Sequence, residues 1–397
     1  MISKKNDYFC AVMKKILYVV DTFTILGGIE RVLGDKLNWL AQHGFRIALM
    51  TVNQGGHAVA FPLCEDIDIC HADILFHRKY QYPLWRRALK ERSMQRNFRK
   101  ALEQKIGAYS PDVIVLTRTA YVKTVLRVCG DIPVVFESHN SCLYYQFEQL
   151  GMVERLRYLY RYHQMKSVAA VVSLTKGDAA VWRRWTPNVV TIPNVVNLNT
   201  TGCYSDCSAK SVIFIGRYSR QKDIHSLMKI WQMVHRRHPD WTLNLFGDYG
   251  DQRDQLMPDL TKMGAGVVIH EPTQAIGVQY LQNSMLLLTS LYEPFGLVMP
   301  EAMSYGLPVV AFDCPYGPAN IITDGVDGFL IKDRNVEDFA DKVCRLIDDE
   351  PLRRTMGQAG IKSAQRFAAD EIMPRWKNLL ETLYNNVKKC EKVMRPI

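Results

Sequence analysis

Short apolar runs alternate with segments of helical pattern along most of this chain, and the alternation restricts the folds available to it. The first run leads directly into a Gly-Gly turn and a helix-like segment at 29–43. The apolar runs of the first half lie at 14–21, 45–52, 112–117, 133–139 and 168–175. Such alternation is typical of an α/β fold with a parallel, doubly wound sheet, where ligands bind at the carboxyl ends of the strands.

The alternation stops at a polar, irregular stretch at 191–210 and then begins again, which indicates two domains joined by a linker. The runs of the second series lie at 211–223, 241–250, 267–272, 284–290, 307–313 and 328–331. We predict two Rossmann-like domains, at 13–195 and 196–369, that face each other across a cleft. Residues 1–12 are expected to be a leader or a disordered arm. A helix within 370–397 is expected to cross back to the first domain.

The composition is that of an ordinary globular protein, with 48% hydrophobic and 23% charged residues among 397. No apolar run approaches the roughly 18 residues that a membrane-spanning helix needs. The ten cysteines form no paired framework, and Cys203 and Cys207 have no nearby His or Cys to complete a zinc site. We therefore expect reduced thiols and a cytoplasmic location.

The positive charge of the chain is concentrated in its first half. Residues 1–195 hold 27 Lys and Arg against 16 Asp and Glu, a net charge of +11, whereas residues 196–397 have a net charge of −1. The densest stretch, 78–105, has ten basic and two acidic residues with aromatic residues between them. Such a helix suits anionic lipid headgroups. The alternatives are a solvated helix face and nucleic acid, although no nucleic-acid-binding motif is present.

Two glutamates eight positions apart, Glu293 and Glu301, flank a predicted strand–loop–helix junction. The run 284–290 ends just before Glu293, and a helix is predicted to begin at Gly296 with Glu301 about one turn further on. A helix start presents unpaired N–H groups that attract anions. Carboxylates accept hydrogen bonds from hydroxyls. The junction therefore suits a ligand that carries both phosphates and sugar hydroxyls.

Three other segments follow predicted strands directly and supply further candidate ligand contacts. Gly27 and Gly28 permit a tight turn, either as a plain strand–helix connection or as a close approach to a phosphate. Arg217 and Lys222 suit a diphosphate, because Arg offers a planar fork and Lys a mobile point charge. His139 ends the run 133–139, and its place in the presumed cleft favours a ligand contact over a surface histidine.

Asp66 and Asp68 form an Asp-x-Asp pattern, which can hold Mg²⁺ or Mn²⁺ on a nucleotide diphosphate. Their alternation with Ile67 and Ile69 favours a strand whose acidic residues face water. We therefore predict no metal site and no cofactor.

Taken together, these segments make the chain resemble family 4 of the glycosyltransferases, which are retaining enzymes with the GT-B fold. The resemblance covers roughly residues 14–385. It rests on the segments 27–30, 192–194, 246–250 and 315–330, on His139, on Gly216 and Arg217 with Lys222, and on the Glu-x7-Glu segment. This sequence departs from the family at Asn320, where Glu is common.

The resemblance implies a nucleotide-diphosphate-sugar donor that is held mainly by the second domain. Arg217 and Lys222 would neutralise the diphosphate. Glu301 would accept hydrogen bonds from the ribose, and Glu293 would bind the transferred sugar. The implied catalytic residues are His139, Glu293, Arg217 and Lys222, and further donor contacts are implied for Gly28 and for the backbone N–H groups of Phe295, Gly296 and Leu297.

The resemblance further implies transfer of a hexose or N-acetylhexosamine from a UDP-sugar of the GalNAc, Gal or Glc type. The acceptor would be lipid-linked or a saccharide, in the synthesis of bacterial cell-surface polysaccharide. The basic first domain would then lie at the inner face of the plasma membrane. The alternatives are a GDP-mannose-dependent mannosyltransferase, a sugar-nucleotide epimerase on the same fold, and a non-catalytic scaffold, which the intact cleft residues disfavour.

Overall fold

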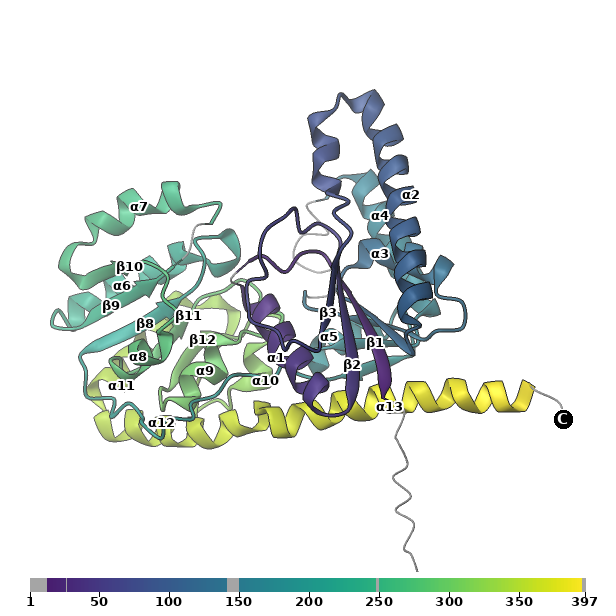
Figure 1. Cartoon of the computed structure of the whole chain (residues 1–397). Helices are drawn as coiled ribbons and strands as arrows, with labels where there is room; N and C mark the ends of the chain where they lie inside the picture. The colour runs from purple at the N-terminus through teal and green to yellow at the C-terminus, as the bar shows by residue number, and fades with distance from the viewer. Residues whose placement is uncertain (1–12, 26, 141–149, 248–249, 395–397) are drawn as a thin grey trace, which may run out of the picture.

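Two parallel sheets form two domains that lie side by side (Figure 1). The computed structural model describes residues 13–25, 27–140, 150–247 and 250–394. The two-domain α/β prediction is confirmed, and the predicted division between residues 195 and 196 falls between the sheets. The predicted leader at 1–12 lies outside the described residues.

The N-terminal sheet has seven parallel strands in the order β3-β2-β1-β4-β5-β6-β7. Its strands are β1 (Lys14–Val20), β2 (Phe45–Thr51), β3 (Asp68–His71), β4 (Val113–Leu116), β5 (Val134–Glu137), β6 (Ala170–Ser173) and β7 (Val189–Thr191). The order changes direction beside β1, so the carboxyl ends of β1 and β4 border the crevice where α/β proteins bind ligands.

The C-terminal sheet has six parallel strands in the order β10-β9-β8-β11-β12-β13. Its strands are β8 (Ser211–Ile215), β9 (Thr242–Phe246), β10 (Val267–His270), β11 (Leu286–Leu288), β12 (Val309–Phe312) and β13 (Gly328–Ile331). The corresponding switch in direction lies between β8 and β11, whose carboxyl ends lead into the segments around Arg217 and Glu293.

Helices cover both faces of each sheet, as the packing of β1 shows for the N-terminal domain. Ile16, Tyr18 and Val20 belong to one apolar cluster, while Leu17 and Val19 belong to another. The N-terminal helices are α1 (Gly28–Gln42), α2 (Leu84–Tyr109), α3 (Thr119–Val128), α4 (Met152–His163) and α5 (Lys176–Trp182). Those that follow are α6 (Ile224–Arg237), α7 (Arg253–Lys262), α8 (Ile276–Leu281), α9 (Val298–Ser304), α10 (Pro318–Ile321), α11 (Val336–Asp348), α12 (Glu350–Ala364) and α13 (Ala369–Met394).

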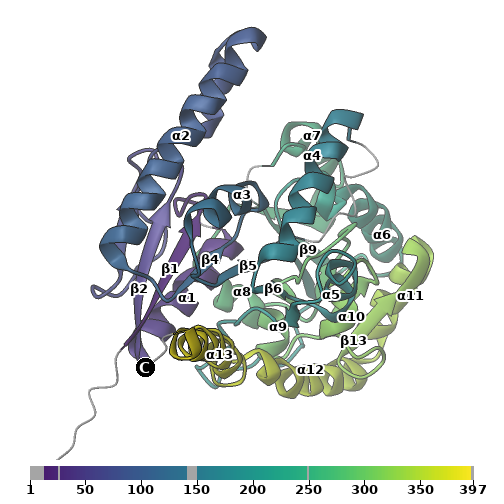
Figure 2. The ribbon, with the colours of Figure 1, turned by 90° about the vertical axis from the view of Figure 1, so that its right-hand side faces the viewer.

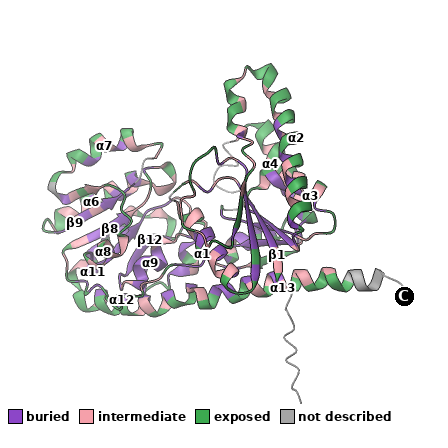
Figure 3. Ribbon diagram, viewed as in Figure 1, coloured by how far each residue is buried: buried purple, intermediate pink, exposed green. Residues whose placement is uncertain are grey.

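The basic stretch at 78–105 lies in a short 3₁₀ segment (Phe76–Gln81) and in α2, which projects from the N-terminal domain (Figures 1 and 2). Most of α2 is exposed, and its buried residues are Met94, Phe98, Leu102 and Tyr109 (Figure 3). Its exposed side chains include Leu84, Trp85 and Leu89. None of the described helices combines the length and the apolar character that a bilayer span requires.

The chain crosses between the domains at two places, and the crossings touch. The first follows β7, and the second leads from α12 through Phe367 into α13. The backbone N–H of Val196 donates to the carbonyl oxygen of Phe367 over 3.0 Å. From there α13 runs beneath the N-terminal sheet, where Met373 and Trp376 join the same apolar cluster as β1 (Figure 1).

Candidate active site

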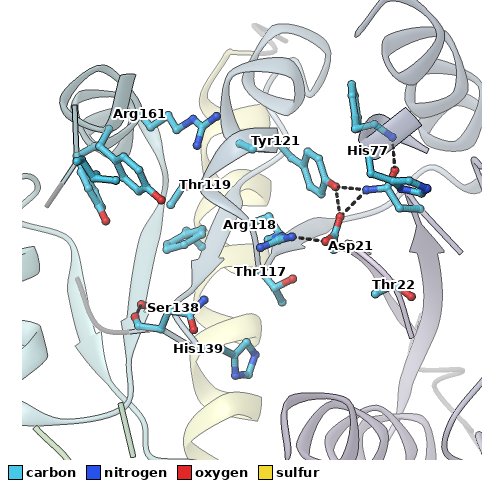
Figure 4. A pocket seen from close by; sticks show the side chains of 18 of the residues that line it. Asp21, Thr22, His77, Thr117, Arg118, Thr119, Tyr121, Ser138, His139 and Arg161 are labelled. Carbon is cyan, nitrogen blue, oxygen red and sulfur yellow. Dashed lines mark hydrogen bonds and ion pairs between the residues drawn. The ribbon is translucent and has the colours of Figure 1, made fainter. Parts of the chain in front are cut away.

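A cavity of about 970 Å³ separates the two domains at the carboxyl ends of their strands. Its N-terminal wall includes Asp21, Arg118 and His139, which follow β1, β4 and β5 (Figure 4). Its C-terminal wall includes Arg217 and Tyr316. The predicted cleft is therefore present, and it brings His139 and Arg217 to a common space from different domains.

Lys222 and Glu293 meet at the end of β8. The turn after β8 folds the Lys222 side chain over Gly216, where a Cβ atom would lie 3.2 Å from the Lys222 side chain. The Nζ of Lys222 is 2.5 Å from Oε1 of Glu293, which also accepts from Ser290 Oγ at 2.7 Å. Glu293 is buried, and a buried charge needs a partner of opposite sign. Lys222, which was predicted to contact the diphosphate, is that partner.

The backbone around Glu293 is held by residues 315–317, a support that motif spacing did not reveal. The Glu293 N–H donates to the Pro315 carbonyl at 2.7 Å, and the N–H groups of Tyr316 and Gly317 donate to the Glu293 carbonyl at 2.8 Å. A Cβ atom on Gly317 would lie 2.0 Å from the carbonyl oxygen of Phe295. Glycine at 317 therefore lets the two loops approach closely.

Glu301 lies in the first turn of α9, as predicted, and is buried. Its Oε1 is 3.1 Å from Nη1 of Arg31, and its Oε2 accepts from the Tyr280 hydroxyl at 3.2 Å. Burial raises the pKa of Glu301 above its ordinary value, and the charge of Arg31 and the Tyr280 hydrogen bond oppose this shift. Arg31 comes from α1 of the other domain and was not among the predicted site residues.

Gly28 begins α1 and lies against the start of α9. A Cβ atom at Gly28 would be 2.9 Å from Cδ1 of Leu297. The N–H groups of Phe295, Gly296 and Leu297 precede the first turn of α9, where helices leave such groups unpaired. Because α9 has only seven residues, an anion bound there would depend on individual backbone N–H groups rather than on a long helix dipole.

Arg217 is exposed on the cavity wall, and within the described ranges no ion pair joins it to a carboxylate. Its charge is felt by Glu30 of α1: burial raises the pKa of Glu30, and His139 and Arg217 are among the groups that oppose the rise. Arg217 therefore faces the N-terminal domain, as a group that contacts a bridging anion would.

A polar network that the sequence did not reveal lies on the N-terminal wall (Figure 4). Asp21, directly after β1, accepts hydrogen bonds from Asn53 at 2.6 Å and from the Tyr121 hydroxyl, and it pairs with Arg118. Burial, and then the Asp21 carboxylate, raise the pKa of Tyr121. Asp21, Asn53 and Arg118 each follow a neighbouring strand, so the sheet topology brings them together.

The Asp-x-Asp pattern lies away from the cleft. The strand predicted there exists as the short edge strand β3, and Asp68 stands at its amino end, where it pairs with Lys105 at 2.7 Å. Asp66 precedes the strand and is exposed. Across the described ranges, no cluster of three His, Cys, Asp or Glu side chains is arranged to hold a metal ion.

Asn320, where the chain departs from the family pattern, links the two domains. Its Oδ1 accepts from the Lys176 N–H at 3.3 Å, at the start of α5, and its Nδ2 donates to the Tyr316 carbonyl at 2.6 Å. A carboxylate at this position could accept from Lys176 but could not donate to Tyr316. Asn320 thus holds the loop that supports Glu293 against the N-terminal domain.

Two facing α/β domains with a cavity between the carboxyl ends of their strands are the architecture of the GT-B fold. The family model for glycosyl transferases group 1 matches residues 207–363, and the model for glycosyltransferase family 4 matches residues 26–200. The two matches cover both domains and more than half of the chain. The chain therefore belongs to these glycosyltransferases.

Relatives and solved structures extend this match over the whole fold. The amylovoran biosynthesis glycosyltransferase AmsD of Erwinia amylovora is 25% identical over 379 residues, which cover 93% of this chain and 100% of AmsD. A variant of TarM from S. aureus, solved with fondaparinux, alpha-GlcNAc-glycerol and UDP, superposes with a TM-score of 0.75 at 15% identity, over 93% of this chain and 100% of that one. HepE from Anabaena, solved with UDP and glucose, gives a TM-score of 0.70 at 18% identity, over 93% and 99%.

Proposed function

We propose that this glycosyltransferase moves a hexose or an N-acetylhexosamine from a UDP-sugar, with retention of the anomeric configuration. The observation that carries the proposal is the pairing of Lys222 with Glu293 at the strand ends that also hold Arg217. Lys222 contacts the buried carboxylate of Glu293, so the group that would bind the diphosphate lies beside the group that would bind the sugar of the same donor. Glu301, on the far side of the α9 start, is then available to the ribose.

The chemistry follows from where charge develops. As the bond between the anomeric carbon and the diphosphate oxygen breaks, negative charge grows on the diphosphate and positive charge on the sugar ring. Arg217 and Lys222 stabilise the diphosphate, and Glu293 lies on the sugar side. We favour attack by the acceptor hydroxyl on the face that the diphosphate leaves, with its proton passing to the leaving phosphate oxygen. This route uses no covalent enzyme intermediate and no metal ion.

UDP is the favoured nucleotide because TarM and HepE, which share this fold, were each solved with UDP. GDP-mannose is the alternative donor. The similarity to AmsD, a glycosyltransferase named for amylovoran biosynthesis, supports a role in bacterial cell-surface polysaccharide synthesis. The acceptor would be a saccharide or a lipid-linked saccharide that enters the cavity beside the Asp21 network.

Attachment to an anionic membrane is part of this proposal. The basic helix α2 exposes Leu84, Trp85 and Leu89, and α4 exposes Met152 and Leu156; both helices also contribute other residues to the lining of the cavity. Cations and apolar side chains together suit the interface of a bilayer with anionic lipids. We place the enzyme at the cytoplasmic face of the plasma membrane, where a lipid-linked acceptor would meet the cavity.

Incubation of the purified protein with single donors tests the reaction. UDP-glucose, UDP-galactose, UDP-GalNAc, UDP-GlcNAc and GDP-mannose are each supplied with and without a membrane extract that contains acceptor. Release of UDP that depends on the acceptor, with an α-linked product by NMR from an α-linked donor, is the expected result. Isomerised donor without acceptor would indicate the epimerase, turnover of GDP-mannose alone would indicate the mannosyltransferase, and no turnover of any donor would contradict the proposal.

A further inference from the structure

A buried ion pair lies directly behind His139. Glu137 is the last residue of β5, and the extended chain places Glu137 and His139, two residues apart, on the same side. Both are buried, with 1% of Glu137 and 7% of His139 exposed. The Nε2 atom of His139 is 3.3 Å from Oε1 of Glu137. The carboxylate is therefore the group against which one edge of the imidazole rests.

Lys36 completes the arrangement from α1. It is 1% exposed, and its Nζ contacts both carboxylate oxygens of Glu137. The same Nζ lies 4.1 Å from the ring centroid of Trp376 in α13 and 5.3 Å from that of Tyr18 in β1. Among the described residues, Glu137 is the only carboxylate that pairs with Lys36. The two aromatic rings pack around the ammonium group and hold it beside Glu137.

The charges of the pair are maintained in spite of burial. Burial alone would raise the pKa of Glu137, but the charge of Lys36 first, and then the contact with His139, outweigh burial and lower that pKa to about 2. Burial lowers the pKa of Lys36, and the Glu137 charge opposes the change. Since a buried ion pair contributes little net stability compared with apolar residues of the same shape, its position behind a cleft histidine points to another role.

The other side of His139 is the cavity. Among the described residues, Nε2 of His139 has no well-aligned hydrogen bond, so the 3.3 Å contact to Glu137 is its nearest polar interaction. Contacts of this kind are often long in ligand-free sites and shorten when substrate binds. A proton on Nε2 directed at Glu137 would leave Nδ1 of the neutral ring as a hydrogen-bond acceptor.

We propose that Lys36 and Glu137 are positioning residues that fix the orientation and the tautomer of His139, with the proton on Nε2 and Nδ1 left to accept from a hydroxyl of the transferred sugar. Lys36 holds the carboxylate in one place, and the carboxylate holds the ring. This inference rests on the proposed function only in assigning the sugar to Nδ1. The tautomer itself is a property of the protein alone.

Long-range ¹⁵N–¹H NMR of the imidazole rings in the full-length protein tests the tautomer without any turnover. The His139 signals are assigned by their loss in His139→Gln. We expect a protonated Nε2 and an unprotonated Nδ1 at pH 8. A proton on Nδ1 would overturn the inference even if the enzyme transfers sugar as proposed, and absence of turnover would leave this measurement valid.

Kinetics test whether the pair acts through His139. Removal of one partner would leave a buried unpaired charge, so both are changed together in Lys36→Met/Glu137→Gln, which keeps the shape of the pair. We expect kcat to fall by about 10- to 100-fold, as for other partners that orient a histidine, with a smaller change in the donor KM. In the His139→Gln background the same double substitution should have no further effect, because the residues act as one unit.

The control is a second lysine–glutamate ion pair, between Lys14 of β1 and Glu381 of α13 at 2.8 Å, which lies away from the cleft. Lys14→Met/Glu381→Gln should leave kcat unchanged. Additive losses in the His139→Gln background would show that Lys36 and Glu137 only support the fold, and would overturn the positioning role. The melting temperature of each variant separates unfolding from the catalytic effect.

Discussion

Arg31 and Glu301 belong to different domains and form an ion pair between them, with 3.1 Å between Nη1 and Oε1. In the proposed function Glu301 accepts hydrogen bonds from the ribose, and its ionised form accepts them more strongly than its protonated form. Burial raises the pKa of Glu301 from its ordinary value of 4.5, and Arg31 is the first of the groups that lower it. Arg31 thus favours the ionised form of Glu301, and in the proposed function it would compete with the ribose for that carboxylate.

Arg31→Met should therefore change how UDP binding depends on pH. At pH 8 the variant should bind UDP at least as tightly as the wild type, because the ribose no longer competes with the guanidinium. As the pH falls, affinity should be lost at a higher pH than in the wild type, by about tenfold per unit once Glu301 is protonated. Calorimetric titration between pH 5.5 and 8 measures both curves, and superimposable curves would contradict the prediction. Exposed Arg127, replaced by Met, is the control.

The raised pKa of Glu301 also predicts how the stability of the protein changes with pH. A carboxyl group with a raised pKa in the folded state binds its proton more tightly than it does in the unfolded chain. Its contribution to the free energy of unfolding should therefore fall as the pH rises through the window that starts near 4.5. Glu301→Gln should flatten this part of the pH dependence in urea unfolding.

Lys222→Met should reduce kcat by about 10²-fold or more, the scale of losing one electrostatic stabiliser of the leaving group. Arg217→Met should have a similar effect. Lys229, exposed on α6 of the same domain, is the matched control, and Lys229→Met should leave kcat unchanged. Initial rates at saturating donor measure all three, and unchanged rates in both site variants would remove the assignment of the diphosphate to this loop.

Gly317→Ala and Gly107→Ala should have opposite effects on stability. At residue 317 the added Cβ would meet the Phe295 carbonyl at 2.0 Å, so the loop that holds Glu293 must move, at a cost of about 1–3 kcal/mol. At residue 107, on the exposed side of α2, the Cβ meets nothing within 4 Å, and alanine should add about 0.5–1 kcal/mol to the free energy of unfolding. Urea unfolding measures the change in the free energy of unfolding for each variant. An unchanged stability of Gly317→Ala would contradict the close approach of residue 317 to the Phe295 carbonyl.

Vesicle binding should depend on the charge of α2. Each basic residue near an anionic surface contributes about 1 kcal/mol, so Arg86→Gln/Arg87→Gln/Lys90→Gln should weaken co-sedimentation with phosphatidylglycerol vesicles by about 10²-fold. High salt should have the same direction of effect. The control, Lys229→Gln/Arg236→Gln on α6, should bind as the wild type does. Equal binding of all proteins, or binding that ignores salt, would reject membrane attachment through α2.

Activity should persist in EDTA, because the proposed leaving-group stabilisers are Arg217 and Lys222. The measurement is the initial rate with and without the chelator. If EDTA abolished activity and Mn²⁺ restored it, the prediction would be wrong and Asp66 and Asp68 would be the candidate metal ligands. In that event Asp68→Asn should reproduce the loss.

The sequence allowed prediction of the parts of the fold that depend on contiguous residues. Buried strands of a parallel sheet are continuous apolar runs, so β1 and β12 could be located, and the residues that follow them could be placed at one edge. The edge strand β3 was recognisable only by its alternation of acidic and apolar residues. The helix predicted within 370–397 is present as α13, from Ala369 to Met394.

The residues that were missed are those whose partners lie far away in the chain. Lys36 lies in a helix of ordinary amphipathic pattern, and its partner Glu137 is 101 positions away, so nothing local distinguishes it from a surface lysine. Asp21 is a single charged residue directly after β1, and Arg31 is a single charged residue near the start of α1. A charged residue gives no periodic signal, and only the topology of the sheets brings it to its partner.

The two places where the polypeptide passes from one domain to the other are joined by the bond between Val196 and Phe367. Because the two passages lie together, we expect any change in the spacing of the two domains to pivot near this bond. Just beyond the second passage, Trp376 of α13 packs on Lys36, and Lys36 pairs with Glu137, which contacts His139. The junction between the domains and His139 are thus linked through α13, Lys36 and Glu137.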